Sequence, residues 1–254
     1  MEQLTRRNFN ASLLGSLLTF SLVETLCKGD LLAGSIKPLA SNWLAEVEEV
    51  SRGMVSQQVK QLEWQQKIEA LFTHIELKDL LHAIDFDRLS GKLKLPDDHE
   101  GVITTSPLRP AGLPAELSFS TFIYGLKKAR AIVPHCHKNM TSMHMVIGGR
   151  MHGWHFDRVA DEPQHLIIKP TMDKALALGE VSTTSDDQNN IHWFRADGEA
   201  AFTFNLGVYG VDPKVNFGGR QFYLDAANGE KLSDGSLRVR HLSMREAYSL
   251  YGKS

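Results

Sequence analysis

The stretch that decides the fold is Pro134-His135-Cys136-His137, at the end of a strand-like run that begins at Ala131. Side chains two residues apart on a strand project from the same face, so His135 and His137 can converge on one point. Imidazole nitrogens placed in this way are suitable ligands for a divalent metal ion. Cys136 projects from the opposite face, which predicts a small buried residue rather than a nucleophile.

Turn residues and β-forming runs extend on both sides of this stretch. Gly148 and Gly149 follow an apolar segment after His137 and predict a hairpin turn where the chain reverses. Seven to eight short strands divided by turns predict a barrel or a sandwich. The strand-like runs are 119–124, 131–133, 143–147, 151–156, 165–168, 191–194, 201–206 and 221–224.

Composition limits the classes of function. The chain has 254 residues, 42% of them hydrophobic and 23% charged, which is enough to bury a core without disulfides. A net charge of -2 argues against nucleic acid as a partner. Cys27 and Cys136 are too few for a disulfide framework or a cysteine-based zinc ribbon. The distinctive feature is the 11 histidines, most of which lie between His135 and His192.

The histidine spacing resembles that of the cupin superfamily. The first cupin motif is His-x-His followed by a short variable stretch and a strand that ends in Gly, as in His135 to Gly149 of this chain. The second cupin motif is a later strand with one more His. It is matched by Asn190-Ile191-His192-Trp193-Phe194. The resemblance implies a mainly β fold, a double-stranded β-helix or jelly-roll barrel over residues 100–254, with a metal held by His135, His137 and His192. Most metal-binding cupins add a Glu about four residues after the second His, where this chain has Thr141.

Longer stretches resemble one cupin branch, the thiol dioxygenases that include the plant cysteine oxidases and cysteamine dioxygenase. The similar stretches cover about residues 117 to 226 and are His135-Cys136-His137-Lys138-Asn139-Met140-Thr141, Met151-His152, Asn190-Ile191-His192, Leu206-Gly207, Gly219-Arg220 and Phe222-Tyr223-Leu224-Asp225.

The chain also departs from that family at several positions. Lys138 and Asn139 replace a Pro and a Gly, Phe204 replaces an Asp, and Val208-Tyr209 replaces Pro-Pro. Gln221 stands near the place where some relatives hold a Cys that is cross-linked to a Tyr. The three histidines are retained.

The resemblance implies an enzyme that binds Fe(II) and adds both atoms of dioxygen to a thiol, giving a sulfinic acid. Cysteamine, cysteine or a protein N-terminal Cys are the candidate thiols. Tyr124, Tyr209 and Tyr223 are the candidate catalytic hydroxyl donors, and the residues do not select one of them. The alternative is a non-catalytic cupin of the cell envelope that binds a metal or a small ligand, which the replacement of the Asp by Phe204 favours.

Other histidines and the methionines have plainer interpretations. His152 and His155 could suggest a second metal site, but they are three apart, so on a strand they point to opposite faces, which argues against a joint ligand role. With His144 and His165 they are predicted to be structural or solvent-facing, His152 or His155 being the best candidates for support of the metal ligands. A methionine cluster can indicate copper, but barrel-core packing is the favoured interpretation. This cluster consists of Met140, Met143, Met145 and Met151.

The N-terminal part has two segments of different character. Thr5-Arg6-Arg7-Asn8-Phe9 precedes the apolar run 11–23, which resembles a twin-arginine export signal and is too short for a stable membrane span. Residues 1–33 are therefore predicted to direct export to the periplasm, with an amphipathic helix in a cytoplasmic protein as the alternative. Apolar residues at helical spacing predict two or three helices within 41–90, and 243–251 predicts a short closing helix.

Overall fold

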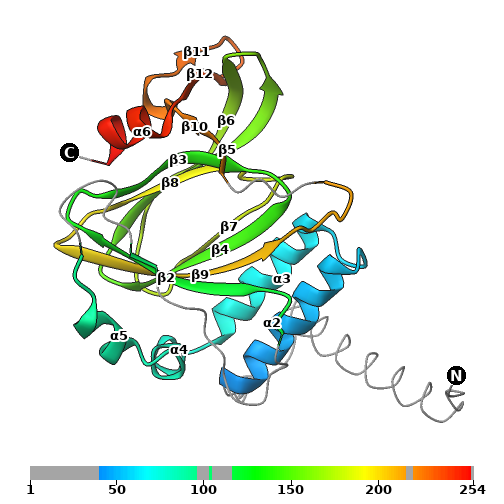
Figure 1. The fold of residues 1–254 in the computed structure, drawn as a ribbon, viewed down its shortest axis with the longest axis vertical. Helices are drawn as coiled ribbons and strands as arrows, with labels where there is room; N and C mark the ends of the chain where they lie inside the picture. Colours follow the sequence, from blue (N-terminus) through cyan, green and yellow to red (C-terminus); the bar gives the residue numbers. More distant parts are fainter. Residues whose placement is uncertain (1–39, 96–102, 105–115, 216–219, 253–254) are drawn as a thin grey trace, which may run out of the picture. The chain divides into compact units, whose positions relative to one another are not determined.

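The computed structural model describes residues 40–95, 103–104, 116–215 and 220–252. The predicted export signal at 1–33 lies outside the described residues. Within the described part of the chain, no helix is both long and apolar enough to cross a membrane. Pro38–Ser254 forms one compact unit, in which two antiparallel sheets face each other (Figure 1).

The first sheet has five strands that alternate in sequence with strands of the second. Its order is β1 (Ile103–Thr104), β2 (Ser120–Lys127), β9 (Ala200–Tyr209), β4 (Met140–Gly148) and β7 (Val181–Thr184). The second, seven-stranded sheet has the order β10 (Arg220–Leu224), β3 (Ala131–His137), β8 (Ile191–Ala196), β5 (Met151–Asp161), β6 (His165–Leu176), β12 (Leu237–Leu242) and β11 (Glu230–Lys231).

The chain passes from one sheet to the other at almost every step from β2 to β10. This winding is the double-stranded β-helix, so the protein has the cupin fold and the predicted fold class is confirmed. All eight predicted strands are present, and β1, β7, β11 and β12 were not predicted. They are short or lack a long run of β-forming residues, which weakens the sequence signal.

The predicted hairpin at Gly148 and Gly149 is wrong. The turn joins β4 of the five-stranded sheet to β5 of the seven-stranded sheet, so the two strands do not pair. Gly149 has φ +68°, and a Cβ there would lie 2.1 Å from the carbonyl oxygen of Ala200. The turn residues therefore mark a crossing between sheets, which requires glycine for the same conformational reason as a hairpin.

The helical region contains four helices rather than two or three: α2 (Ala40–Val55), α3 (Gln61–His74), α4 (Leu77–Ala83) and α5 (Phe86–Lys92). The extra division arises because Ile75 and Glu76 are extended and Asp85 is left-handed, with φ 52°. Both breaks are too short to interrupt the apolar spacing in the sequence.

These helices cover the outer face of the five-stranded sheet (Figure 1). Trp43 and Phe72 meet edge to face with ring centroids 4.4 Å apart, and Phe72 lies 6.1 Å from Phe204 of β9. Helices and sheet thus share one hydrophobic core. Residues 41–90 and the barrel belong to one compact unit.

A second core lies on the outer face of the seven-stranded sheet, under the predicted closing helix, α6 (Met244–Tyr251). A capping box begins this helix, because the Ser243 side chain accepts from the Glu246 amide while the Glu246 carboxylate accepts from Ser243. Cys136 is fully buried in this core, as its position between two inward-facing histidines predicts.

Candidate metal centre

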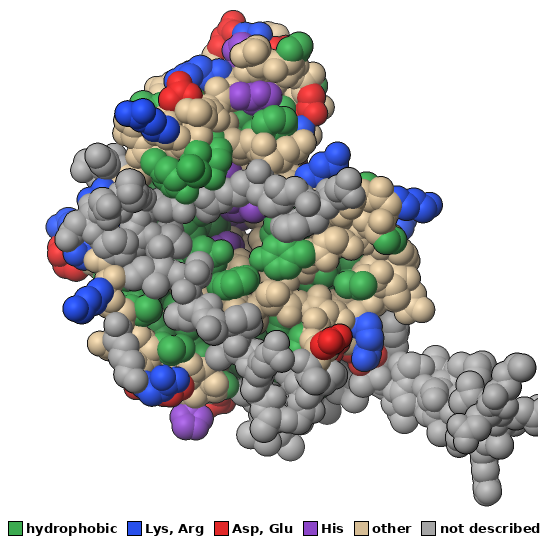
Figure 2. Space-filling view, in the orientation of Figure 1, with side chains coloured by type: hydrophobic (Ala, Val, Ile, Leu, Met, Phe, Trp, Pro, Cys, Tyr) green, Lys and Arg blue, Asp and Glu red, His purple; other side chains and the backbone are tan. Residues whose placement is uncertain are grey.

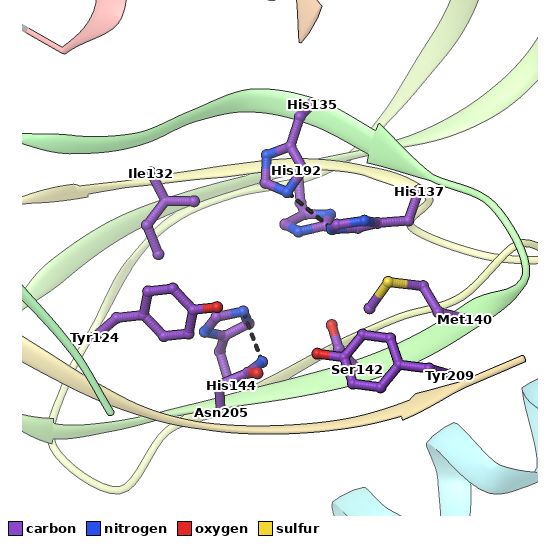
Figure 3. A pocket seen from close by; sticks show the side chains of 10 residues that line it. All are labelled: Tyr124, Ile132, His135, His137, Met140, Ser142, His144, His192, Asn205 and Tyr209. Carbon is purple, nitrogen blue, oxygen red and sulfur yellow. Dashed lines mark hydrogen bonds between the residues drawn. The ribbon is translucent and has the colours of Figure 1, made fainter. Parts of the chain in front are cut away.

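Three histidines meet inside the barrel. His135 and His192 are directly paired across β3 and β8, and His137 follows two residues along β3 on the same face. One ligand atom from each lies within 4.8 Å of the others, and Nε2 of His135 is 2.9 Å from Nε2 of His137 (Figure 3). Nitrogens bound to one ion at about 2.1 Å lie roughly 3 to 4 Å apart, so small ring movements suffice for joint binding.

Backbone carbonyls orient two of these rings. Nδ1 of His135 lies 2.7 Å from the oxygen of Val133, and Nδ1 of His192 lies 3.4 Å from the oxygen of Asn190. A carbonyl only accepts, so each Nδ1 carries the proton and each Nε2 keeps its lone pair. A carbonyl that accepts from Nδ1 in this way directs the Nε2 of a histidine toward a metal ion.

The surroundings keep His192 uncharged. His135 and His192 are buried, and burial together with nearby His137, His155 and His144 holds the pKa of His192 well below its ordinary value. A neutral imidazole is the form that binds a metal. The site is therefore ready to bind a cation without first releasing a proton from His192.

The five-stranded sheet supplies the opposite wall of a cavity of about 140 Å³ (Figure 3). His144 and Asn205 lie side by side on β4 and β9, and Asn205 Nδ2 donates to His144 Nε2 at 3.0 Å. The same amide donates to the oxygen of Met143 at 3.0 Å. Figure 2 shows histidine and hydrophobic side chains around a hollow on one face of the molecule. The ten lining residues are Tyr124, Ile132, His135, His137, Met140, Ser142, His144, His192, Asn205 and Tyr209.

Two of the three tyrosines named from the sequence line this cavity. Tyr124 of β2 and Tyr209 of β9 do so, and burial with the neighbouring Tyr124 raises the pKa of Tyr209 to about 12. Tyr209 therefore keeps its hydroxyl proton at neutral pH. Tyr223 is not among the lining residues, and its ring lies 6.1 Å from that of Tyr248 on α6.

The position at which many cupins carry a Glu does not face the histidines. Thr141 donates to the oxygen of Thr184 at 2.8 Å, whereas Met140 and Ser142, its neighbours on β4, line the cavity. Successive side chains of a strand point to opposite faces, so Thr141 faces away from the cavity that Met140 and Ser142 line. Among the described residues, the group that can hold a metal at this site consists of histidines alone.

Three of the positions that depart from the thiol dioxygenase pattern have defined surroundings in the structure. Phe204 points outward into the core under the helices, while its neighbour Asn205 faces the cavity. Phe204 therefore removes no group from the site. Asn139 has φ 61°, a conformation that asparagine tolerates better than most residues, so it can stand in for Gly. Gln221 accepts from Arg158 Nη1 at 2.7 Å.

The remaining histidines divide between surface and interior. His152 is bonded to Asp173 at 2.6 Å and His165 lies 4.0 Å from Glu162, both near the surface. His155 is buried beside the centre, 6.1 Å from His192 between ring centroids. His144 faces the centre from the other sheet. Alternation from Ser142 along β4 is the sequence signal that could have placed His144 there.

The methionines mostly pack, as predicted. Met143 and Met145 belong to the core under the helices, and Met151 packs in a separate apolar cluster. Met140 differs, because it lines the cavity beside the histidines.

No protein-family model and no curated protein matches the sequence. Similar solved structures include procruciferin, an 11S globulin from Brassica napus, at 15% identity and TM-score 0.31 over 37% of this chain and 21% of that one. The Schizosaccharomyces pombe Cnp3 cupin domain matches at 8% identity and TM-score 0.33 over 47% of this chain and 71% of that one. Recombinant oxalate oxidase in complex with glycolate matches at 17% identity and TM-score 0.36 over 48% and 58%.

The chain therefore spans about a fifth of procruciferin and just over half of the oxalate oxidase. The assignment of the fold rests on the strand order of this chain itself. Together with the three converging histidines, that order defines a double-stranded β-helix barrel with a candidate metal centre.

Proposed function

We propose that the protein is a non-haem Fe(II)-dependent thiol dioxygenase, which converts a thiol to a sulfinic acid with dioxygen. The observation that carries this proposal is the ligand group of three histidines, His135, His137 and His192, to which the described part of the chain adds no carboxylate. Neutral ligands leave the full charge of a divalent ion available to an anionic substrate.

Bound iron would supply adjacent coordination positions for a thiolate and for dioxygen, which turns a bimolecular encounter into an intramolecular one. In the overall reaction both oxygen atoms are transferred to the sulfur and the S–H bond is lost. The sulfur is oxidised by four electrons, dioxygen takes up these electrons, and the thiol proton is released to solvent.

The residues of this chain bind and orient the substrate. A cavity of about 140 Å³ admits a small thiol or the side chain of a terminal Cys. Tyr209, with its raised pKa, remains a hydroxyl donor at neutral pH, and Tyr124 lies beside it. Both face the histidines from the opposite sheet, so their hydroxyls are the candidates to hydrogen-bond the sulfur or the developing sulfinate oxygens (Figure 3).

The test is dioxygen uptake by the iron-loaded protein with cysteamine, cysteine and a Cys-initiated peptide. We expect stoichiometric uptake and a sulfinic acid product with at least one of them. Tyr209→Phe should reduce the rate while leaving the iron content unchanged, because it removes a donor and no ligand.

Iron-loaded wild type that takes up no dioxygen with any of the three thiols would contradict the proposal. Retained iron with no uptake would favour the alternative, a non-catalytic metal-binding cupin. Failure to bind iron at all would contradict the metal centre itself.

A further inference from the structure

Helix α3 presents one stripe of polar side chains to the barrel. Gln61, Gln65 and Glu69 are spaced by four residues, so they lie on one face of the helix. All three bond to the segment 183–186, which comprises the end of β7 and the two residues after it. A polar stripe of this kind on a helix that otherwise packs with apolar residues indicates a specific attachment rather than a solvated face.

Gln61 binds Asp186 twice. Its Nε2 donates to the Asp186 carboxylate at 3.0 Å, and its Oε1 accepts from the Asp186 amide at 2.9 Å. Gln65 adds two contacts, accepting from Ser185 Oγ at 2.7 Å and donating to Thr183 Oγ1 at 3.1 Å. The helix thus fixes both the backbone and the side chain of the segment.

From Asp186 the contacts continue to the strand that carries two metal ligands. The Asp186 carboxylate accepts from the amide of Asn139 at 2.9 and 3.0 Å, two residues after His137. The side chain of Asn139 accepts from the Asp212 amide at 2.6 Å and donates to the Asp212 oxygen at 2.9 Å. The turn after His137 is therefore held from two sides.

Asn190 connects the same segment to two of the three histidines, His137 and His192. Its Nδ2 donates to the oxygens of Ser185, at 3.0 Å, and His137, at 3.2 Å. Its own carbonyl oxygen accepts from Nδ1 of His192. Displacement of this segment would consequently move His137 and rotate His192.

We infer that the helical region positions the metal centre, with Asp186, anchored by Gln61 of α3, as the central positioning residue. This inference rests on metal binding by the three histidines and is independent of thiol oxidation. Asp186 and Gln61 touch no ligand ring. Asp186 acts through the amide of Asn139, two residues after His137. The adjacent carbonyl of Ser185 holds Asn190, whose contacts set where His137 and His192 point.

The experiment is an anaerobic titration of the metal-free full chain with Co(II), reading the dissociation constant and the ligand-field absorption spectrum. Asp186→Ala should weaken Co(II) binding roughly 10- to 100-fold, the range for loss of a group that orients metal ligands, and should change the spectrum. Asp186→Asn keeps one acceptor oxygen and should recover part of the affinity.

Gln61→Ala tests the link to the helix in a variant that leaves the Asp186 to Asn139 contact in place. It should weaken binding by several-fold, and its effect should not add fully to that of Asp186→Ala, because Gln61 acts by orienting the Asp186 carboxylate that this second variant lacks. Gln66→Ala is the matched control, since Gln66 is an exposed glutamine on the same helix. It should bind Co(II) like wild type.

Thermal unfolding of each metal-free variant separates positioning from general stability. The inference would be overturned if a folded Asp186→Ala variant had the Co(II) affinity and spectrum of wild type. If Asp186→Ala does not fold, the same result for Gln61→Ala would overturn it. Wild type that binds no Co(II) would overturn the metal centre and this inference together. Wild type that binds Co(II) but oxidises no thiol would overturn only the proposed activity.

Discussion

The two walls of the cavity carry buried imidazoles in different settings. On the seven-stranded sheet, His135 and His192 turn Nδ1 to backbone carbonyls and leave Nε2 facing the interior. On the five-stranded sheet, His144 is bonded through Nε2 to Asn205, so that lone pair is already used. The first wall is arranged to bind a cation. The second wall is arranged to face a substrate bound to that cation. Each wall can be altered by mutation without changing the other.

The largest effect is expected on the cation-binding wall. His192→Ala should lower the affinity for Fe(II) or Co(II) by more than about 100-fold, since loss of an orienting group alone costs up to that much. Metal titration of the metal-free protein measures this. An affinity within tenfold of wild type would mean that His192 is not a ligand.

Acid should lower the stability of the metal-free protein through His155, which lies on the seven-stranded sheet. Burial, with a smaller effect of Lys174, lowers the pKa of His155 from 6.5 to about 3. Above pH 6.5 both folded and unfolded chains are neutral at His155, so it contributes no pH dependence. Below that value only the unfolded chain takes up the proton, and stability falls as the pH falls toward 3, by about 2 kcal/mol at pH 5.

Urea unfolding of the metal-free protein between pH 7.5 and 4.5 measures this loss. His155→Leu removes the titrating group and an Nε2 that has no partner among the described residues, so its stability should depend less on pH. An equally steep dependence in wild type and variant would assign the acid sensitivity to other groups.

On the opposite wall, His144→Leu should separate binding from chemistry. The metal affinity should stay within about threefold of wild type, because His144 is not a ligand. The rate of thiol oxidation should fall about tenfold, because Asn205, which lines the cavity, loses a hydrogen-bond partner worth about 1.4 kcal/mol. Parallel metal titration and dioxygen uptake provide the comparison, and a metal affinity as low as that of His192→Ala would contradict the division into two walls.

The smallest effect is expected outside both walls. Cys136 lies between two ligands in sequence but is buried in the core beneath α6, where burial raises the pKa of its thiol to about 11. Cys136→Ser should cost about 1 kcal/mol of stability, because a hydroxyl replaces the thiol in an apolar setting. Metal affinity and thiol oxidation should be retained, as judged beside the wild type. Loss of activity in the folded variant would show that its sulfur takes part in the reaction.

The cation-binding wall was predictable because its signal is local. Two histidines in alternation on one strand share a face whatever the rest of the fold does, and Cys136 must then face the other way. The third ligand, His192, required the resemblance to the cupin motifs, since nothing in the spacing alone brings β8 beside β3.

The opposite wall could not be predicted, because a shift of one residue reverses every side chain of a strand. The family comparison directed attention to Phe204 and Thr141, which face the helices or the neighbouring strand, and away from Asn205 and Ser142, which face the cavity. The role of the helices could not be predicted either, because a local pattern does not specify which surfaces pack together. Periodicity predicts that residues 41–90 are helical but does not identify the sheet face they cover.

The central claim is that one divalent ion is held by His135, His137 and His192. X-ray absorption spectroscopy of the iron-loaded protein, beside His192→Ala, tests it most directly. We expect multiple scattering from three imidazoles at about 2.0 to 2.2 Å in the wild type, and from no more than two in any iron that the variant retains. A wild-type spectrum that requires fewer than three imidazoles, or that is unchanged in His192→Ala, would contradict the claim.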